Sequence, residues 1–158
     1  MPVRIIPFEP KYAPLFRDLN MAWLTTYFYA EPKDIELLEA CEQSIINKGG
    51  HIFFGAIDQE IVGCYSLIQL NEQEFELGKM AVDPNYQGQK IGHQLLEHAI
   101  GFGIRMNWKK IILYSNTLLK PAIHLYKKYG FREITMEDPT PYARSNIKMA
   151  LILPRGYE

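Results

Sequence analysis

Apolar residues along the chain recur at two spacings, and these predict a protein with both strands and helices. Short alternating or continuous apolar runs are typical of strands, and apolar residues three or four positions apart are typical of helices. Strands are predicted at residues 3–6, 52–57, 61–70, 75–82, 109–114, 131–136 and 146–153. Helices are predicted at residues 10–24, 32–46, about 88–106, and from 116 or 117 to 129. The order β-α-α-β-β-β-α-β-α-β-β predicts an α/β fold in which helices cover a mixed sheet.

The first two helices show which side they should bury. In the first, the residues expected to face the core are Leu15, Leu19 and Trp23. In the second, they are Ile35, Leu38, Ile45 and either Cys41 or Glu42. These residues recur at helical spacing, so each set forms one apolar face.

The strand–helix–strand unit over residues 75–114 should form the parallel part of the sheet, with a right-handed crossover. The second strand of this unit is a dense apolar run, which is typical of a strand buried on both faces. In open α/β sheets, ligands bind at the carboxyl ends of such strands. Residues 80–82 and 114–116 should therefore meet at one ligand-binding edge.

Composition narrows the class of protein. A chain of 158 residues that is 47% hydrophobic can form one folded core, so we expect a single domain over residues 1–158. The net charge of −1 does not support a basic face for nucleic acid. Cys41 and Cys64 show no metal or redox spacing, and we expect no metal site. Neither a run of 18 apolar residues nor a leader sequence is apparent, so we expect a soluble cytoplasmic protein without membrane contact.

The segment from residue 80 to residue 92 carries the clearest chemical signal. A strand leads through the turn Asp83-Pro84-Asn85 into a helix that is expected to begin near Gly88. The first N–H groups of a helix have no partner within it, and the helix dipole favours negative charge there. Gly88 and Gly92 let a ligand approach the backbone closely. The segment therefore predicts a pyrophosphate site, although neither the Rossmann pattern nor the P-loop pattern is present.

This segment resembles the pyrophosphate loop of the GNAT family of N-acetyltransferases, whose pattern is Q/R-x-x-G-x-G/A. Gln87 stands at its first position and Gly92 at its last, while Lys90 replaces the middle glycine. That replacement matters if the loop needs a left-handed residue there. Residues 76–82 and the later Asn116…Tyr126…Tyr129-Gly130-Phe131 are also similar to the family. The resemblance covers residues 75–131 closely and implies a central, mixed, mostly antiparallel sheet flanked by helices.

The resemblance implies acetyl-coenzyme A as the acetyl donor. The pantetheine arm should lie along the backbone of Met80, Ala81 and Val82, as an added strand does. The implied pyrophosphate contacts come from Gln87, Gly88, Gln89, Lys90, Ile91 and Gly92. Asn116 is implied to hydrogen-bond the pantetheine or a bridging water, and its alternative is a helix cap.

Two residues could carry the chemistry. Tyr126 stands where a tyrosine of the family points at the coenzyme sulfur, where it can protonate or stabilise the departing thiolate. Its alternative is an aromatic side chain packed on the sheet. Glu76 begins the family-like strand segment and is the best candidate for the base that deprotonates the amine, with Glu74 as fallback. Its alternatives are an exposed strand glutamate and a charge that merely attracts the amine.

The acceptor site is expected to involve Trp23, Tyr27, Glu31, Tyr142 and Arg144. A pocket enclosed by Trp23, Tyr27, Tyr142 and Arg144 would favour a small molecule, and an open groove would favour a peptide. Arg144 could grip a carboxylate of the acceptor through two hydrogen bonds, and its alternative is a surface pair with Glu137 or Asp138.

The function predicted is acetyl transfer from acetyl-coenzyme A to a primary amine of a small molecule or amino acid, by direct attack in a ternary complex. Nothing suggests an acyl-enzyme intermediate, because neither cysteine precedes a plausible base. The alternatives are a protein or peptide N-acetyltransferase and a non-catalytic acyl-coenzyme A binding module. Acetyl-coenzyme A and the amine are the expected partners, and a homodimer is left open.

Overall fold

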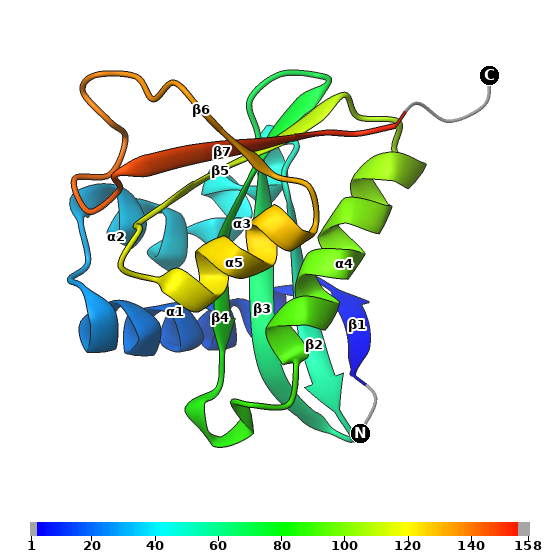
Figure 1. Cartoon of the computed structure of the whole chain (residues 1–158). Coiled ribbons are helices and arrows are strands. Elements are labelled where there is room, and N and C mark those ends of the chain that lie inside the picture. The colour runs from blue at the N-terminus through cyan, green and yellow to red at the C-terminus, as the bar shows by residue number, and fades with distance from the viewer. Residues whose placement is uncertain (1–2, 155–158) are drawn as a thin grey trace.

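The computed structural model describes residues 3–154, which form a seven-stranded sheet with helices on both faces (Figure 1). The strands lie in the order β1-β2-β3-β4-β5-β7-β6. Their bounds are β1 Arg4–Pro7, β2 His51–Ile57, β3 Glu60–Gln69, β4 Glu74–Val82, β5 Lys110–Ser115, β6 Arg132–Ile134 and β7 Ile147–Ile152. The β4–β5 pair is parallel and the other neighbouring strands are antiparallel, as the sequence predicts.

The helices divide between the two faces of the sheet. They are α1 Ala13–Tyr27, α2 Pro32–Glu39, α3 Cys41–Ser44, α4 Ile91–Arg105 and α5 Lys120–Lys128, with short 3-10 turns at Pro10–Tyr12, Ile46–Lys48 and Pro84–Tyr86. One core cluster joins α1, α2 and α3 to the sheet through residues such as Phe16, Leu38 and Phe54. The other joins α4 and α5 to the opposite face through residues such as Leu95 and Ile123. Every helix between residues 3 and 154 is too short or too polar to cross a lipid bilayer.

The predicted faces of the first two helices are partly wrong. In α1 the buried residues are Phe16, Asn20 and Leu24, while Leu15 is 41% exposed. The true face is therefore displaced by one residue from the predicted one, which places Trp23 beside a cavity described below. In α2 Ile35 is exposed, and Leu37 is buried beside Leu38. Apolar spacing alone does not separate a core face from a neighbouring face that lines a ligand cavity.

Several predicted boundaries also differ. The second predicted helix is broken at Ala40, whose φ of −127° and ψ of 47° are not helical. Helix α4 begins at Ile91 and not near Gly88, and α5 begins at Lys120, with a proline in its first turn. Proline is favoured in the first turn of a helix because its missing N–H would have no partner there. The residues between Asn116 and α5 consequently form a turn at the end of β5.

Candidate active site

Strands β4 and β5 separate after a short parallel stretch, and this opens the site. Residues 74–76 pair with residues 110–112, and beyond them β5 turns away from β4 (Figure 1). A cavity of about 260 Å³, here called the central cavity, occupies this region. It is lined by residues 76–80 of β4, residues 113–116 at the end of β5, residues 20, 23, 24 and 28 of the α1 region, residues 119, 122, 125 and 126 of the α5 region, and residues 92, 142, 144 and 145. Of the two carboxyl-end segments predicted to meet, Met80 and residues 114–116 line this cavity, whereas Ala81 and Val82 do not.

A bulge in β4 shapes one wall of the central cavity. Cys64 of β3 pairs with Ala81 and Ser66 pairs with Gly78, so Lys79 and Met80 together oppose Tyr65. Lys79 adopts a left-handed conformation with φ of 52°. Such a bulge bends the strand and redirects its side chains.

A second cavity, of about 370 Å³ and here called the loop cavity, adjoins the central cavity. It is lined by residues 80–82 of β4 and by residues of the following loop, including Gln87, Gly88 and Lys90. Trp23, Met80 and Gly92 line both cavities, so the two are adjacent. Most of the residues predicted to bind the coenzyme line the loop cavity, while Asn116 and Tyr126 line the central cavity. Gln89 lines neither cavity.

The loop before α4 needs left-handed residues at two positions. Gly88 has φ of 81°, which glycine adopts without strain. Lys90 has φ of 59° and ψ of 28° and is the N-cap of α4. The replacement of the family's middle glycine therefore falls on a position that does need a left-handed residue. A non-glycine residue there carries roughly 1 kcal/mol of strain.

Gly92 leaves open space at the start of α4. A Cβ atom built on this residue would meet no heavy atom within 4 Å. The N–H groups of the first helical turn have no partner within α4, and they carry the positive end of the helix dipole. The position therefore fits a diphosphate group: glycine backbone beside a helix N-terminus, in a loop lined by exposed Gln87 and Lys90.

Tyr126 reaches the central cavity from α5. Its side chain is partly buried, and among residues 3–154 its hydroxyl has no hydrogen-bond partner. Burial raises its pKa to about 12, so the hydroxyl stays protonated at neutral pH. A neutral phenol with an uncommitted O–H is a suitable donor to a developing anion.

Glu76 lies on β4, in the wall of the central cavity, with 5% of its surface exposed. Burial raises its pKa, while the positive charges of Lys33 and Lys79 oppose that rise. The alternative of an exposed strand glutamate is therefore wrong, while a charge that merely attracts the amine stays an alternative role. Glu74 lies two residues earlier on the strand, does not line the cavity, and forms an ion pair with Lys110 at 3.4 Å.

Asn116 makes two hydrogen bonds at the end of β5. Its Oδ1 accepts from the N–H of Leu118 at 2.8 Å, and its Nδ2 donates to the carbonyl oxygen of Arg144 at 2.8 Å. The side chain thus closes the turn before α5 and holds residues 142–145 against the cavity. It does not cap α5 itself, whose N-cap is Leu119.

The predicted acceptor residues divide into three groups. Trp23, Tyr142 and Arg144 line the central cavity. Tyr27 is 48% exposed and does not line the cavity, and its ring packs against that of Trp23 at 5.4 Å between centroids. Glu31 lies behind the cavity wall, where its carboxylate accepts hydrogen bonds from the backbone N–H groups of Ala143 and Arg144.

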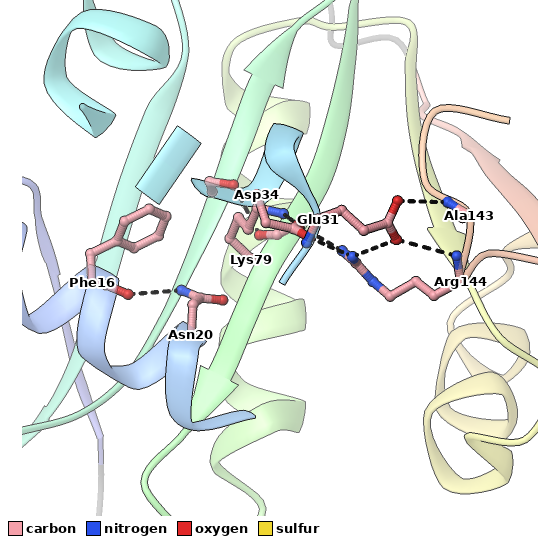
Figure 2. A network of polar contacts seen from close by, with 9 residues as sticks. Phe16, Asn20, Glu31, Asp34, Lys79, Ala143 and Arg144 are labelled. Carbon is pink, nitrogen blue, oxygen red and sulfur yellow. Dashed lines mark hydrogen bonds and ion pairs between the residues drawn. The ribbon is translucent and has the colours of Figure 1, made fainter. Parts of the chain in front are cut away.

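A buried ionic network joins three distant parts of the chain (Figure 2). The Arg144 guanidinium donates to both oxygens of Asp34, at 2.6 and 2.8 Å, and also to Glu31 at 3.1 Å. Lys79 donates to the same Asp34 from the bulge of β4. The partner of Arg144 is therefore neither Glu137 nor Asp138, and a substrate carboxylate would have to displace a carboxylate of the protein. Asp34 is fully buried, and burial raises its pKa, but the hydrogen bonds from Arg144 and the charge of Lys79 outweigh burial and leave it at about 2.

Sequence reasoning missed Asp34 and Lys79 as parts of this network. Asp34 lies in the first turn of α2, where it forms a capping box with Glu31. Nothing in the local sequence shows that the same carboxylate also pairs with two cations from residues 79 and 144. In the part of the chain that the structure describes, no group of His, Cys, Asp and Glu side chains could hold a metal ion.

Comparison with known proteins agrees with this geometry. The profile of the acetyltransferase (GNAT) family matches residues 15–131, which confirms the resemblance seen in the sequence. Spermidine N(1)-acetyltransferase of Escherichia coli K12 is 26% identical over 137 residues, which are 82% of this chain and 72% of that protein. A GNAT acetyltransferase of Staphylococcus aureus Mu50 superposes with a TM-score of 0.84 at 26% identity, over 97% of this chain and 100% of that one. The protein yncA of Salmonella typhimurium, solved with acetyl-CoA, shares the fold with a TM-score of 0.77 at 16% identity, over 100% of this chain and 98% of that one.

Proposed function

Because the chain belongs to the GNAT family of acetyltransferases, we propose that it transfers the acetyl group of acetyl-coenzyme A directly to a primary amine bound in the central cavity. The observation that supports this best is that the loop cavity, suited to a diphosphate, adjoins a central cavity lined by the Glu76 carboxylate and the Tyr126 phenol. Family membership supports the acyltransferase class, with acetyl-coenzyme A as donor substrate. The residue roles below belong to the proposal.

The donor would be held by backbone more than by side chains. Residues 80–82 of β4 line the loop cavity, and their edge toward β5 has no ladder partner among the described residues. A pantetheine arm carries amide groups, so it can pair with that edge as a strand would. The loop from Gln87 to Gly92 and the first turn of α4 would take the diphosphate.

Glu76 would accept the proton of the ammonium, directly or through water. Its raised pKa makes it a stronger base than an exposed glutamate, and it is 5% exposed in the same cavity as Tyr126. Tyr126 would donate its hydroxyl proton, or a hydrogen bond, to the departing thiolate. The thioester supplies the activated acetyl carbonyl, and the protein supplies alignment, base and acid.

One assay separates catalysis from simple binding. The protein is incubated with acetyl-coenzyme A and a mixture of amines, amino acids and short peptides, and release of free thiol is measured, with calorimetry of coenzyme binding in parallel. Amine-dependent thiol release supports the proposal. Coenzyme binding without thiol release from any amine would favour the non-catalytic alternative, and release with peptides alone would favour a protein acceptor. The cytoplasmic location, the single domain over residues 1–158 and a homodimer stay predictions.

A further inference from the structure

We propose that the acceptor is a primary monoamine with a compact apolar body, and not a polyamine, an inference that rests on the proposed acetyl transfer. The inference is drawn from the distribution of charged side chains around the central cavity. Among the described residues that line this cavity, Glu76 provides the sole carboxylate. If Glu76 pairs with the reacting ammonium, a second ammonium of the same molecule finds no carboxylate in the lining.

In the described part of the chain, three other carboxylates lie near the cavity, and each already has partners. Glu137, whose charge also acts on Glu76, lies outside the lining, accepts from the Tyr114 hydroxyl and pairs with Lys148 at 3.3 Å. Asp34 lies outside the lining and binds two cations, Arg144 through both its oxygens and Lys79 through one. Glu31 accepts from Arg144 and from two backbone N–H groups. Withdrawing Asp34 would leave buried Lys79 without its ion-pair partner, and withdrawing Glu31 would leave two backbone N–H groups without their acceptor. Both changes are costly. Neither carboxylate is therefore available to a substrate.

Positive charge also surrounds the aromatic wall of the cavity. The ring of Tyr142 has Arg144 at 4.6 Å, Lys79 at 4.7 Å and Lys33 at 5.0 Å from its centroid. Lys33 is exposed, and it belongs with Lys79 to the cations that act on Glu76. Asp34 and Glu31 balance the charges of Arg144 and Lys79, so this network offers a second ammonium no net attraction. That ammonium would lose water without gaining a carboxylate partner in the lining.

The remaining lining suits an apolar body. Trp23, Leu24 and Phe28 of the α1 region face the cavity, and the rings of Trp23 and Phe28 pack at 5.7 Å between centroids. Leu113 lines it from β5. Apolar and aromatic walls with few polar groups are typical of small-molecule sites, in which a single polar contact fixes orientation.

A matched pair of amines tests this inference. Hexylamine and 1,6-diaminohexane have the same chain and differ only in a terminal ammonium. We expect kcat/KM for hexylamine, and for 2-phenylethylamine, to exceed that for the diamine and for spermidine by at least ~10-fold, because the second ammonium would be desolvated without a partner. Equal or better use of the diamine or spermidine, or acetylation confined to peptides, would overturn the acceptor class and leave acetyl transfer standing. Failure of every amine despite coenzyme binding would overturn both.

A variant can reverse the preference. Phe28 is partly buried at the C-terminal end of α1, so Phe28→Glu adds a carboxylate at the cavity edge. We expect it to raise kcat/KM for 1,6-diaminohexane relative to hexylamine by at least ~10-fold, since a charge-assisted contact becomes possible. Phe28→Leu is the matched variant and should keep the monoamine preference. An unchanged ratio in a folded Phe28→Glu protein would count against an acceptor body lying along this wall.

Discussion

At the scale of single residues, burial acts on Tyr126 and Glu76 in the same direction and with opposite chemical consequences. Both side chains line the central cavity, and burial raises the pKa of each. For the phenol this keeps the proton in place, so it remains a donor. For the carboxyl it strengthens the affinity for a proton, so it becomes a better acceptor. Acyl transfer needs both groups, because the ammonium must lose a proton before it attacks and the departing thiolate must gain one.

Removal of the Tyr126 hydroxyl should affect turnover and not coenzyme binding. Tyr126→Phe keeps the ring that packs against Phe131 and removes only the O–H that faces the cavity. We expect kcat to fall by ~10²-fold or more, the usual worth of general acid assistance, with the Kd for acetyl-coenzyme A unchanged. Tyr129→Phe removes a hydroxyl that is bonded to Glu97 outside both cavities, and it should keep wild-type kcat. Equal kcat in the two variants would leave Tyr126 with a packing role alone.

The acid limb of the pH–rate profile should report Glu76. Below its pKa the carboxyl is protonated and cannot accept the ammonium proton, so activity falls as pH decreases. Because burial raises this pKa, the limb should lie above the pH at which an exposed glutamate titrates. Glu76→Gln should flatten the limb and lower kcat/KM by ~10²-fold or more. Glu74→Gln, which breaks only the ion pair with Lys110, should preserve it. A Glu76→Gln profile of wild-type shape and height would transfer the base role elsewhere.

At the scale of elements, substitution of two glycines in helix α4, Gly92 and Gly101, should have different effects on coenzyme binding. Glycine within a helix costs roughly 0.5–1 kcal/mol relative to alanine. At Gly92 the surrounding space would accept a Cβ, so folding alone gives no reason for glycine. We therefore expect Gly92→Ala to hold or increase the free energy of unfolding, and yet to raise the Kd for acetyl-coenzyme A by at least ~10-fold. The measurements are urea unfolding and calorimetry.

Gly101 provides the matched control for that experiment. It lies in the same helix, and a Cβ there would meet only the mobile end of Arg105, at 3.4 Å. Gly101→Ala should stabilise the protein by up to about 1 kcal/mol and leave coenzyme affinity as it is. If both substitutions leave the Kd unchanged, the start of α4 is not the diphosphate site.

The ionic network around Asp34 connects α2, the bulge of β4 and the segment that contains Tyr142. Asp34→Asn leaves two buried cations short of a partner, so we expect a loss of about 3–5 kcal/mol in the free energy of unfolding near neutral pH. The pKa of Asp34 in the folded protein is about 2, below its ordinary value of 3.8. The unfolded chain therefore binds the proton more readily, and the stabilisation present above pH 4 is lost as pH falls toward 2.

Urea unfolding at several pH values checks this expectation. The difference in stability between wild type and Asp34→Asn should shrink by about 1 kcal/mol between pH 5 and pH 3. Asp18→Asn is the control, because its ion pair with Arg17 is exposed and should contribute under about 1 kcal/mol at any pH. A pH-independent difference for Asp34→Asn would mean that this carboxylate titrates normally.

At the scale of the whole molecule, the sequence predicts the sheet well and the interior ionic contacts poorly. The order of elements and the parallel β4–β5 pair follow from apolar spacing and from local turn signals around Asp83 and Gly88. The residues at which α4 and α5 begin are harder to predict. The start of α4 depends on the left-handed backbone of Lys90, and the start of α5 depends on the turn after Asn116, and neither conformation is specific to one residue type.

Contacts between distant segments limit prediction of the site in the same way. Glu76, Tyr126 and the loop glycines are each recognisable in a local segment, and the structure places them around adjoining cavities. Arg144 is recognisable only as a possible anion ligand, because its partners lie 110 and 113 residues away in sequence. Lys79 leaves no local signal, because the bulge that turns it toward Asp34 arises from the register of β3 against β4.

The short parallel pairing of β4 with β5 has a consequence for the solubility of the protein. An unpaired strand edge is a template on which other chains can add and aggregate, and proteins usually blunt such edges at the outside of a sheet. Here the open edge lies in the middle of the sheet, and residues of α1, α5 and the 142–145 segment surround the space in front of it. A neighbouring chain can reach this edge only by entering between β4 and β5, so the edge is less open to strand addition than the outermost strands of the sheet are. If the proposed coenzyme pairs with this edge, the same interior position leaves a pairing surface for a small ligand without adding an outer edge at which proteins could aggregate.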